Sequence, residues 1–476
     1  MKNTLSDVII AYEIKIIMGY SLGNSKFENN LSHGNVASQL LKFAMPFIIS
    51  NIIQSLYNVV DLVVVGWFGN DASVAAVNNG SQLTFLATCF AIGISVGATV
   101  LIGQYLGAGD RESLRKTIGT LFVTLAVLAV VATVLMVVLK DALLKLIGVP
   151  AEAFEEASDY LFVTALGTIF IFGYNALSAV MRGMGDSKRP LIFVAIACFT
   201  NIGLDLLFVA VFKMAALGAA IATVIAQGIS MILCIIYLGR NDFIFDFKKL
   251  SSYKVDIDNF KMLVKVGLPT MIQQVSTNLS FLFLVSLANG MGVAASSAVG
   301  IVGKFNGFAI LPAIAVSSAI SAMCAQNIGA DQTERAVKTM RTGMLLAYAI
   351  TIPIFIITKL FPSQILSLFG NNPDIIAEGV NYIDFFSLDY LLVPLFFCMN
   401  GIFIGSGHTT FSLVTNLICA VLVRAPAAWF FSTYVVGGMR GLGLGAPAST
   451  FVSCIFVIVF FISGRWKKRV IIKQNG

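Results

Sequence analysis

The feature that most constrains this chain is a series of twelve apolar segments, each about 20 residues or longer. A stretch of about 20 apolar residues matches a helix that crosses the hydrocarbon core of a bilayer. Charged residues make up only 12% of the sequence, against about 25% in soluble domains. We therefore predict an all-α integral membrane protein with twelve transmembrane helices, at approximately 44–66, 77–105, 117–139, 157–181, 190–212, 214–239, 262–288, 296–324, 339–360, 380–404, 411–435 and 442–464.

The basic residues indicate how these spans are oriented. With both termini in the cytoplasm, 20 Lys and Arg residues lie in the cytoplasmic loops and tail, and five lie on the opposite side: Lys140, Lys145, Lys213, Lys359 and Arg440. This bias is the positive-inside pattern of membrane proteins. The net charge of +7 therefore reflects topology and a lipid bilayer as partner, and we expect no nucleic-acid partner.

The chain contains one structural unit twice. The segments "GQYLGAGDRESLRKTIGT" (103–120) and "AQNIGADQTERAVKTMRT" (325–342) align without gaps, so their residues correspond at one constant offset. Further matches at nearly the same offset are Pro46/Pro269, Gly183/Gly405 and Gly185/Gly407. Each copy holds six spans, an even number, so both copies insert in the same orientation. We predict two six-helix bundles related by a pseudo-two-fold axis along the membrane normal, with a cavity between them.

This repeat divides the chain into five parts. We expect an N-terminal cytoplasmic segment (1–39), an N-terminal bundle (40–239), a cytoplasmic linker (240–259), a C-terminal bundle (260–465) and a basic cytoplasmic tail (466–476). The stretch before Met18 is interrupted by Glu13 and Lys15, which makes it a poor signal peptide. Translation starts either at Met1 or at Met18.

Two acidic residues in the first bundle have no basic counterpart. Asp61 in the first span and Asp205 in the fifth lie roughly 7–11 Å from the outer surface, counted at 1.5 Å per helical residue. Asn201 is one turn from Asp205, and Thr223 on the sixth span falls at a similar depth. A carboxylate within a membrane costs about 2.5–3.5 kcal/mol. The group either keeps a proton, binds a cation such as Na⁺, or hydrogen-bonds neighbouring Asn, Thr or backbone groups and locks the bundle.

The second bundle carries charges of both signs. Lys304 and Asp389 each lie about nine residues from the outer ends of their spans, so a salt bridge between them is geometrically feasible. Arg424 lies near mid-depth. These side chains either pair with one another or line a substrate path. The candidates for lining the cavity are Gln54, Tyr57, Asn58, Asn175, Lys304, Asp389, Asn400 and Arg424.

The sequence offers no constellation for catalysis. It contains neither a GxxxxGK[ST] phosphate-binding loop nor an HExxH zinc motif. We therefore expect a protein that is not an enzyme and that carries no cofactor.

Four motifs and their order resemble the multidrug and toxic compound extrusion (MATE) family. They are "LYNVVDLVVVG" in the first span, "GQYLGAGD" after the second, "MRGMGDSKRP" after the fourth and "NIGLDLLF" in the fifth, and the resemblance covers about residues 36–465. It implies an antiporter in a bacterial cytoplasmic membrane that exports organic cations in exchange for Na⁺ or H⁺ by alternating access. The cation site of similar proteins corresponds to Asp61, Asn201, Asp205 and Thr223.

The chain departs from another branch of that family. That branch uses a Glu in the seventh span and an Asp in the tenth, whereas residues 268–280 contain no acid and Asn400 stands about where the Asp would be. A cation site of that kind is therefore not expected in the second bundle.

Two other functions stay open at this point. A flippase or exporter of lipid-linked or anionic substrates would share the architecture and would use Lys304 and Arg424. A non-transporting receptor or assembly protein would normally carry a sizeable soluble domain, which this chain lacks. The two-half design permits a working monomer.

Overall fold

The computed structural model describes residues 29–240, 243–468 and 470–471. The question of Met1 or Met18 therefore lies outside the described residues. Among the described residues, ten helices are long and apolar enough to cross a membrane, and two bent helix pairs bring the number to twelve when each pair is one span. The described residues are nearly all helical, so the predicted fold class is confirmed.

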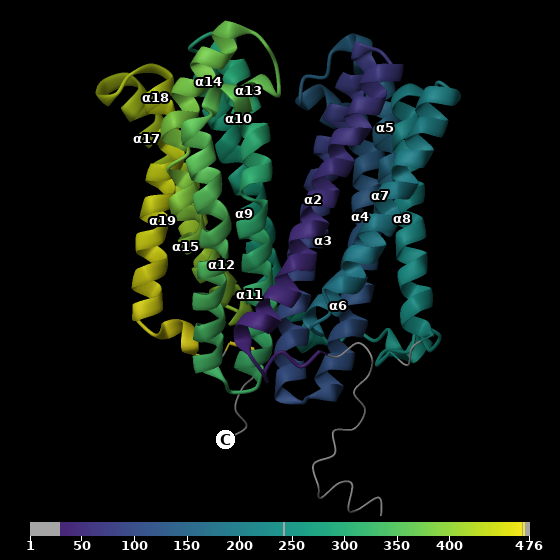
Figure 1. Cartoon of the computed structure of the whole chain (residues 1–476). Helices are drawn as coiled ribbons and strands as arrows, with labels where there is room; N and C mark the ends of the chain where they lie inside the picture. Colours follow the sequence, from purple (N-terminus) through teal and green to yellow (C-terminus); the bar gives the residue numbers. More distant parts are fainter. Residues whose placement is uncertain (1–28, 241–242, 469, 472–476) are drawn as a thin grey trace, which may run out of the picture.

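The first six spans form one bundle and the last six form another (Figure 1). The helices of the first are α2 (Val36–Phe68), α3 (Asp71–Ala108), α4 (Arg111–Leu146), α5 (Ala151–Leu166) with α6 (Thr168–Gly183), α7 (Lys188–Asp205) with the π-helix η1 (Leu206–Val211), and α8 (Ala215–Gly239). The linker between the bundles contains one short 3₁₀ turn, η2 (Leu250–Ser252).

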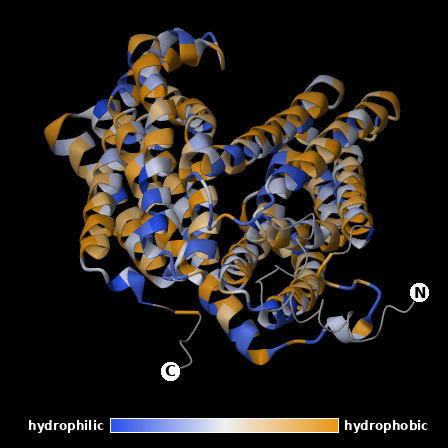
Figure 2. Ribbon diagram, turned by 60° about the horizontal axis from the view of Figure 1, so that its bottom comes forward, coloured by the Kyte–Doolittle hydropathy of each residue, from blue (hydrophilic) through white to orange (hydrophobic). Residues whose placement is uncertain are grey.

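The second bundle repeats this plan. Its helices are α9 (Ile257–Asn289), α10 (Val293–Ala309) with α11 (Leu311–Gly329), α12 (Thr333–Leu360), the short α13 (Pro362–Ser367), α14 (Pro373–Phe386) with α15 (Asp389–Gly405), α16 (Thr409–Leu417) with η3 (Ile418–Arg424), α17 (Ala425–Phe430) and η4 (Phe431–Val435), then α18 (Gly438–Gly443), α19 (Gly445–Ile462) and η5 (Arg465–Lys467). Hydrophobic residues make up much of the length of the helices (Figure 2).

Several helices extend beyond the apolar segments because polar residues cap their ends. Asn35, Asn70, Asp110 and Asp256 each accept a hydrogen bond from the backbone three residues later, which satisfies a free amide of the first turn. The first helix therefore begins at Val36 rather than at residue 40. The fifth and sixth spans are separated by a tight turn, with Lys213 at φ 56° and Ala215 at φ 49°.

The fourth and tenth spans are bent at corresponding places. The axes of α5 and α6 differ by 46° at Gly167, and those of α14 and α15 differ by 47° near Ser387. A Cβ at Gly167 would lie 2.3 Å from the Val224 side chain. The bend therefore lies at a point of close approach between α5–α6 and α8.

The two bundles are joined by a reciprocal contact of α3 and α11. The Gln104 side chain donates to the Gly405 carbonyl at 2.8 Å, and Gln326 donates to the Gly183 carbonyl at 3.1 Å. Each bond is the repeat-related copy of the other. Glycines make this crossing close: a Cβ at Gly107 would lie 2.1 Å from the Gln326 backbone oxygen, and one at Gly329 would lie 2.1 Å from that of Gln104.

This junction lies at one end of the molecule. Figure 1 shows the bundles together at the end that carries the start of α2 and the end of α19, and diverging toward the other end. Asn259 at the start of α9 accepts hydrogen bonds from Tyr105 and Thr117 at the same end. The structure therefore has its bundles closed at the end with the basic loops and apart at the opposite end.

Candidate cation-binding site

Three helices of the first bundle bring together the four residues singled out from the sequence. Asp61 comes from α2, Asn201 and Asp205 come from successive turns of α7, and Thr223 comes from α8. Asp61 is 6% exposed, and Asn201 and Asp205 are fully buried. The predicted cluster is thus assembled in space from the first, fifth and sixth spans, which lie far apart in the chain.

Thr223 connects the amide and one carboxyl group. Its hydroxyl lies 3.5 Å from Oδ2 of Asp61, and Nδ2 of Asn201 lies 3.5 Å from the same hydroxyl. Asp205 lies near Asp61, and the two carboxyl groups interact electrostatically. The polar groups therefore converge on one small volume between α2, α7 and α8.

Most oxygens in this cluster lack a partner. Among the described residues, Oδ1 of Asp61, Oδ1 of Asn201 and both carboxyl oxygens of Asp205 are buried without a hydrogen bond. No Lys or Arg among the described residues interacts with either carboxyl group. Buried polar oxygens are normally paired, and carboxylate, amide and hydroxyl oxygens are the ligands of hard cations. The donor set fits a bound Na⁺ or a proton held between the acids.

A π-helix begins directly after Asp205. The η1 segment widens the end of α7 over Leu206–Val211. Such bulges are rare and are frequent at functional sites. They shift the residues after the bulge around the helix axis, which the apolar pattern of the sequence does not reveal.

Two tyrosines belong to the site as well. Tyr57 lies one turn before Asp61 on α2, and its hydroxyl is buried without a partner beside Thr223 and the two acids. Tyr160 from α5 is buried next to the same acids. Sequence reasoning placed Tyr57 in a substrate cavity and missed Tyr160. No sequence signal marks Tyr160; the structure makes room for its ring at Gly80 on α3, where a Cβ would lie 2.4 Å from it.

The second bundle has a different charge arrangement from the expected one. Lys304 is exposed and forms no salt bridge within the described residues, so its expected pairing with Asp389 is wrong. Asp389, at the start of α15, instead interacts electrostatically with Arg424. The Arg424 guanidinium lies 3.4 Å from the Ser280 hydroxyl and 4.8 Å from the centre of the Phe281 ring.

The repeat relates this arginine to the first site. The separation of Arg424 from Asn201 along the chain is close to the repeat offset. The second bundle therefore places a cation where the first places an amide between carboxylates. The guanidinium of Arg424 repels a second cation, so it disfavours a hard-cation site like that of the first bundle at this position.

The remaining cavity candidates are dispersed. Gln54 is exposed on α2, while the Asn58 side chain lies outside the described residues. Asn175 on α6 bonds the Ile171 carbonyl of its own helix at 2.8 Å. Asn400 on α15 is buried with an unpartnered Oδ1. Gln54, Asn175 and Asn400 form no described hydrogen bond with the first-bundle site.

Comparison with known proteins supports a single family for the whole chain. The family model MatE matches twice, at residues 46–207 and 269–430. The chain is 29% identical to the probable multidrug resistance protein YpnP of Bacillus subtilis, covering 92% of this chain and 97% of that protein. It is 30% identical to the probable multidrug resistance protein YoeA of the same organism, covering 90% and 94%.

A solved structure has the same fold. It is the outward-facing conformation of a multidrug resistance MATE family transporter of the MOP superfamily. The two chains superpose with a TM-score of 0.86 at 23% identity, over 93% of this chain and 98% of the other.

Proposed function

Because this chain belongs to the MATE family of multi-pass membrane transporters, we propose that it is a secondary active exporter of amphipathic organic cations. It exchanges them for Na⁺ or H⁺ by alternating access in a bacterial cytoplasmic membrane, with both termini in the cytoplasm. It is a transporter rather than an enzyme, and it works as a monomer with no cofactor beyond the coupling ion.

The observation that carries this proposal is the unpartnered oxygen cluster of the first bundle. Asp61, Asn201 and Asp205 are buried with free acceptor oxygens, and no basic side chain among the described residues balances the acids. A buried charge without a partner is costly, so the site favours either a proton or a metal cation. Both are coupling ions that an ion gradient supplies.

The site also explains how ion and substrate would alternate. Without a bound cation, the acids present negative charge to the space between the diverging bundles, which favours an organic cation nearby. Binding of one Na⁺ or H⁺ at the oxygens of Asp61, Asp205 and Thr223 reduces that charge by one unit and weakens the attraction for the organic cation. The substrate, now held less strongly, leaves toward the open side, while the ion travels inward when the bundles reorient.

The test is transport by the purified protein in liposomes. A fluorescent organic cation is followed while a Na⁺ gradient or a proton gradient is imposed separately. Movement driven by one gradient names the coupling ion. Asp205→Asn is expected to abolish gradient-driven movement, since it removes one of the two acids. Asp384→Asn is the matched control, because Asp384 pairs with Lys359 at the outer end of the second bundle. Gradient-driven transport by Asp205→Asn at the wild-type rate would refute the mechanism.

A second function is favoured by one observation. Arg424 is a cation inside the second bundle with a buried, unpartnered Nε, which suits an anionic substrate such as a lipid-linked phosphate. If this alternative holds, the wild-type protein in the same liposomes transports an anionic dye and no organic cation. Arg424→Gln then abolishes transport of the anionic dye. Organic-cation transport that survives Arg424→Gln excludes this alternative.

A further inference from the structure

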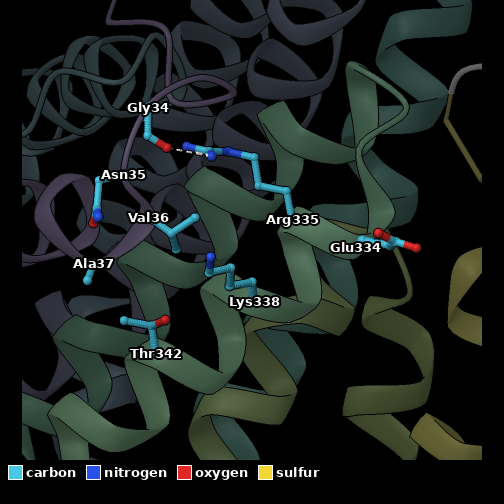
Figure 3. Close-up of a pocket in the computed structure, with 8 residues that line it drawn as sticks. All are labelled: Gly34, Asn35, Val36, Ala37, Glu334, Arg335, Lys338 and Thr342. Atoms are coloured by element: carbon cyan, nitrogen blue, oxygen red, sulfur yellow. Dashed lines mark hydrogen bonds between the residues drawn. The ribbon is translucent and has the colours of Figure 1, made fainter.

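A cavity lies where the start of α2 meets the first turns of α12. Its volume is about 470 Å³. It is lined by residues 34–37, at the start of α2, and by Glu334, Arg335, Lys338 and Thr342 of α12 (Figure 3). A second cavity of about 450 Å³ shares Glu334 and Lys338 and adds Arg341. The two cavities adjoin at Glu334 and Lys338, and together they are called the groove below.

Arg335 builds the wall of this groove and is fully engaged. Its guanidinium donates to the backbone carbonyls of Leu31, His33 and Gly34 and to the Gln39 side chain. These bonds hold the chain before α2 against α12. Arg335 therefore shapes the groove and is not free to bind a ligand.

Among the described residues Lys338 has no salt-bridge partner, unlike its counterpart in the other repeat. That counterpart, Lys116, forms a salt bridge with Glu112 at 2.6 Å. The corresponding pair, Lys338 and Glu334, forms no salt bridge in the described part of the chain. Figure 3 shows the Lys338 ammonium directed toward the start of α2 and the Glu334 carboxylate directed away from it. Within the described part of the chain, the groove thus holds an ammonium group that forms no salt bridge with a carboxylate.

Apolar side chains continue the groove toward the membrane core. Lys338, Arg341 and Leu345 follow one another at helical spacing on one face of α12. Leu345 is 72% exposed, and Leu41 and Met45 on α2 are 45% and 42% exposed. Leu345 lies roughly 10 Å beyond Lys338 along the helix. Cationic groups at the basic end and exposed apolar groups above them complement a molecule with a phosphate head and an acyl chain.

We propose that this groove binds an anionic phospholipid of the cytoplasmic leaflet. Its phosphate sits between Lys338, Arg341 and the positive amino end of α2, and its acyl chain lies over Leu345 and Leu41. The assignment to the cytoplasmic leaflet rests on the proposed orientation, in which both termini lie in the cytoplasm. Lipid binding measured in detergent tests the groove whether or not the protein exports organic cations.

The experiment is a titration of the full-length protein in a neutral detergent with phosphatidylglycerol, followed by native mass spectrometry. Removal of both charges in Lys338→Gln/Arg341→Gln is expected to weaken the first bound phosphatidylglycerol about 30-fold, taking the usual contribution of each basic group near an anionic headgroup. Phosphatidylcholine should bind wild type and variant alike. Lys116→Gln is the matched control, since it removes the repeat-related charge, and is expected to change affinity less than twofold.

A second variant tests the shape of the groove without changing its charge. Thr342→Phe places a ring in the cavity and should also weaken the first phosphatidylglycerol. Equal losses in Lys116→Gln and in the double variant would overturn the proposal, because they would show general surface attraction. Displacement of the lipid by millimolar glycerophosphoglycerol, a headgroup without acyl chains, would overturn the assignment to a lipid.

Discussion

Replacing Gln326 by Leu removes the most central link between the two bundles. The Gln326 side chain is 2% exposed, donates to the Gly183 carbonyl at 3.1 Å and accepts from the Leu31 amide at 2.9 Å. Leucine has a similar volume and cannot form either bond. Both backbone groups belong to buried residues in the present arrangement.

The size of the effect follows from these two orphaned groups. Each buried, unpaired backbone group costs about 1–3 kcal/mol. Taking the lower value for both, Gln326→Leu raises the free energy of the closed basic end by about 2 kcal/mol. If the bundles separate there, water hydrates both groups and the cost disappears. The ratio of the two conformations then shifts about 30-fold, for instance from 1:99 to about 1:3.

Spin-label distances between the diverging ends of the bundles measure this ratio. Leu146 and Leu368 are 82% and 81% exposed, and both can be changed to Cys for labelling. The seven native cysteines are buried, so labels should attach mainly to the introduced thiols. Gln326→Leu is expected to add a population with a shorter distance. Gln104→Leu, which loses one hydrogen bond, should add a smaller population with the shorter distance.

The control is Gln364→Leu, since Gln364 is exposed on α13 and contributes nothing to the junction. A distance distribution unchanged by Gln326→Leu would refute the reasoning. So would an equal change in Gln364→Leu, because that would show a general effect of replacing Gln by Leu.

Two further predictions concern the crossing of α3 with α11 and the cation site. Gly329→Ala should lower the free energy of unfolding by about 1–3 kcal/mol, since the new Cβ would lie 2.1 Å from a backbone oxygen. Gly303→Ala is the control, because a Cβ there meets nothing within 4 Å. Thermal unfolding in detergent compares the two variants, and equal melting temperatures would contradict the prediction. Thr223→Val should raise the half-saturating concentration of the coupling cation about 5- to 10-fold, which corresponds to the loss of one hydroxyl ligand. Thr358→Val loses only a hydrogen bond within α12 and should leave that concentration unchanged. The ion dependence of transport gives the half-saturating concentration of each variant, and identical values would refute the role of Thr223.

Much of the fold could be predicted because membrane insertion is decided locally. The length of an apolar stretch and the basic residues that flank it determine whether a segment spans and in which direction. The repeat was visible for the same reason, since Gln104/Gln326 and Gly183/Gly405 recur at one offset. The sequence did not show that these residues bond one another across the bundles.

The candidate site was predictable from charge alone, but its full composition was not. Asp61 and Asp205 stood out because no base lies at their depth, and a buried acid without a basic partner favours a bound proton or cation. Tyr160 carries no such signal, because a Tyr in an apolar helix is ordinary. It reaches the acids only because Gly80 leaves room for its ring.

The expected pairing of Lys304 with Asp389 shows why equal depth in the membrane is insufficient to predict which side chains pair. Two residues at equal depth meet only if their helices are rotated toward each other, and one residue turns the helix face by about 100°. The bend of 47° between α14 and α15 changes that rotation further. The sequence by itself determined the number, direction and duplication of the spans and the presence of two unbalanced acids. Only the packing of bent and π-bulged helices decided which side chains face one another, because rotation about a helix axis depends on all neighbouring helices at once.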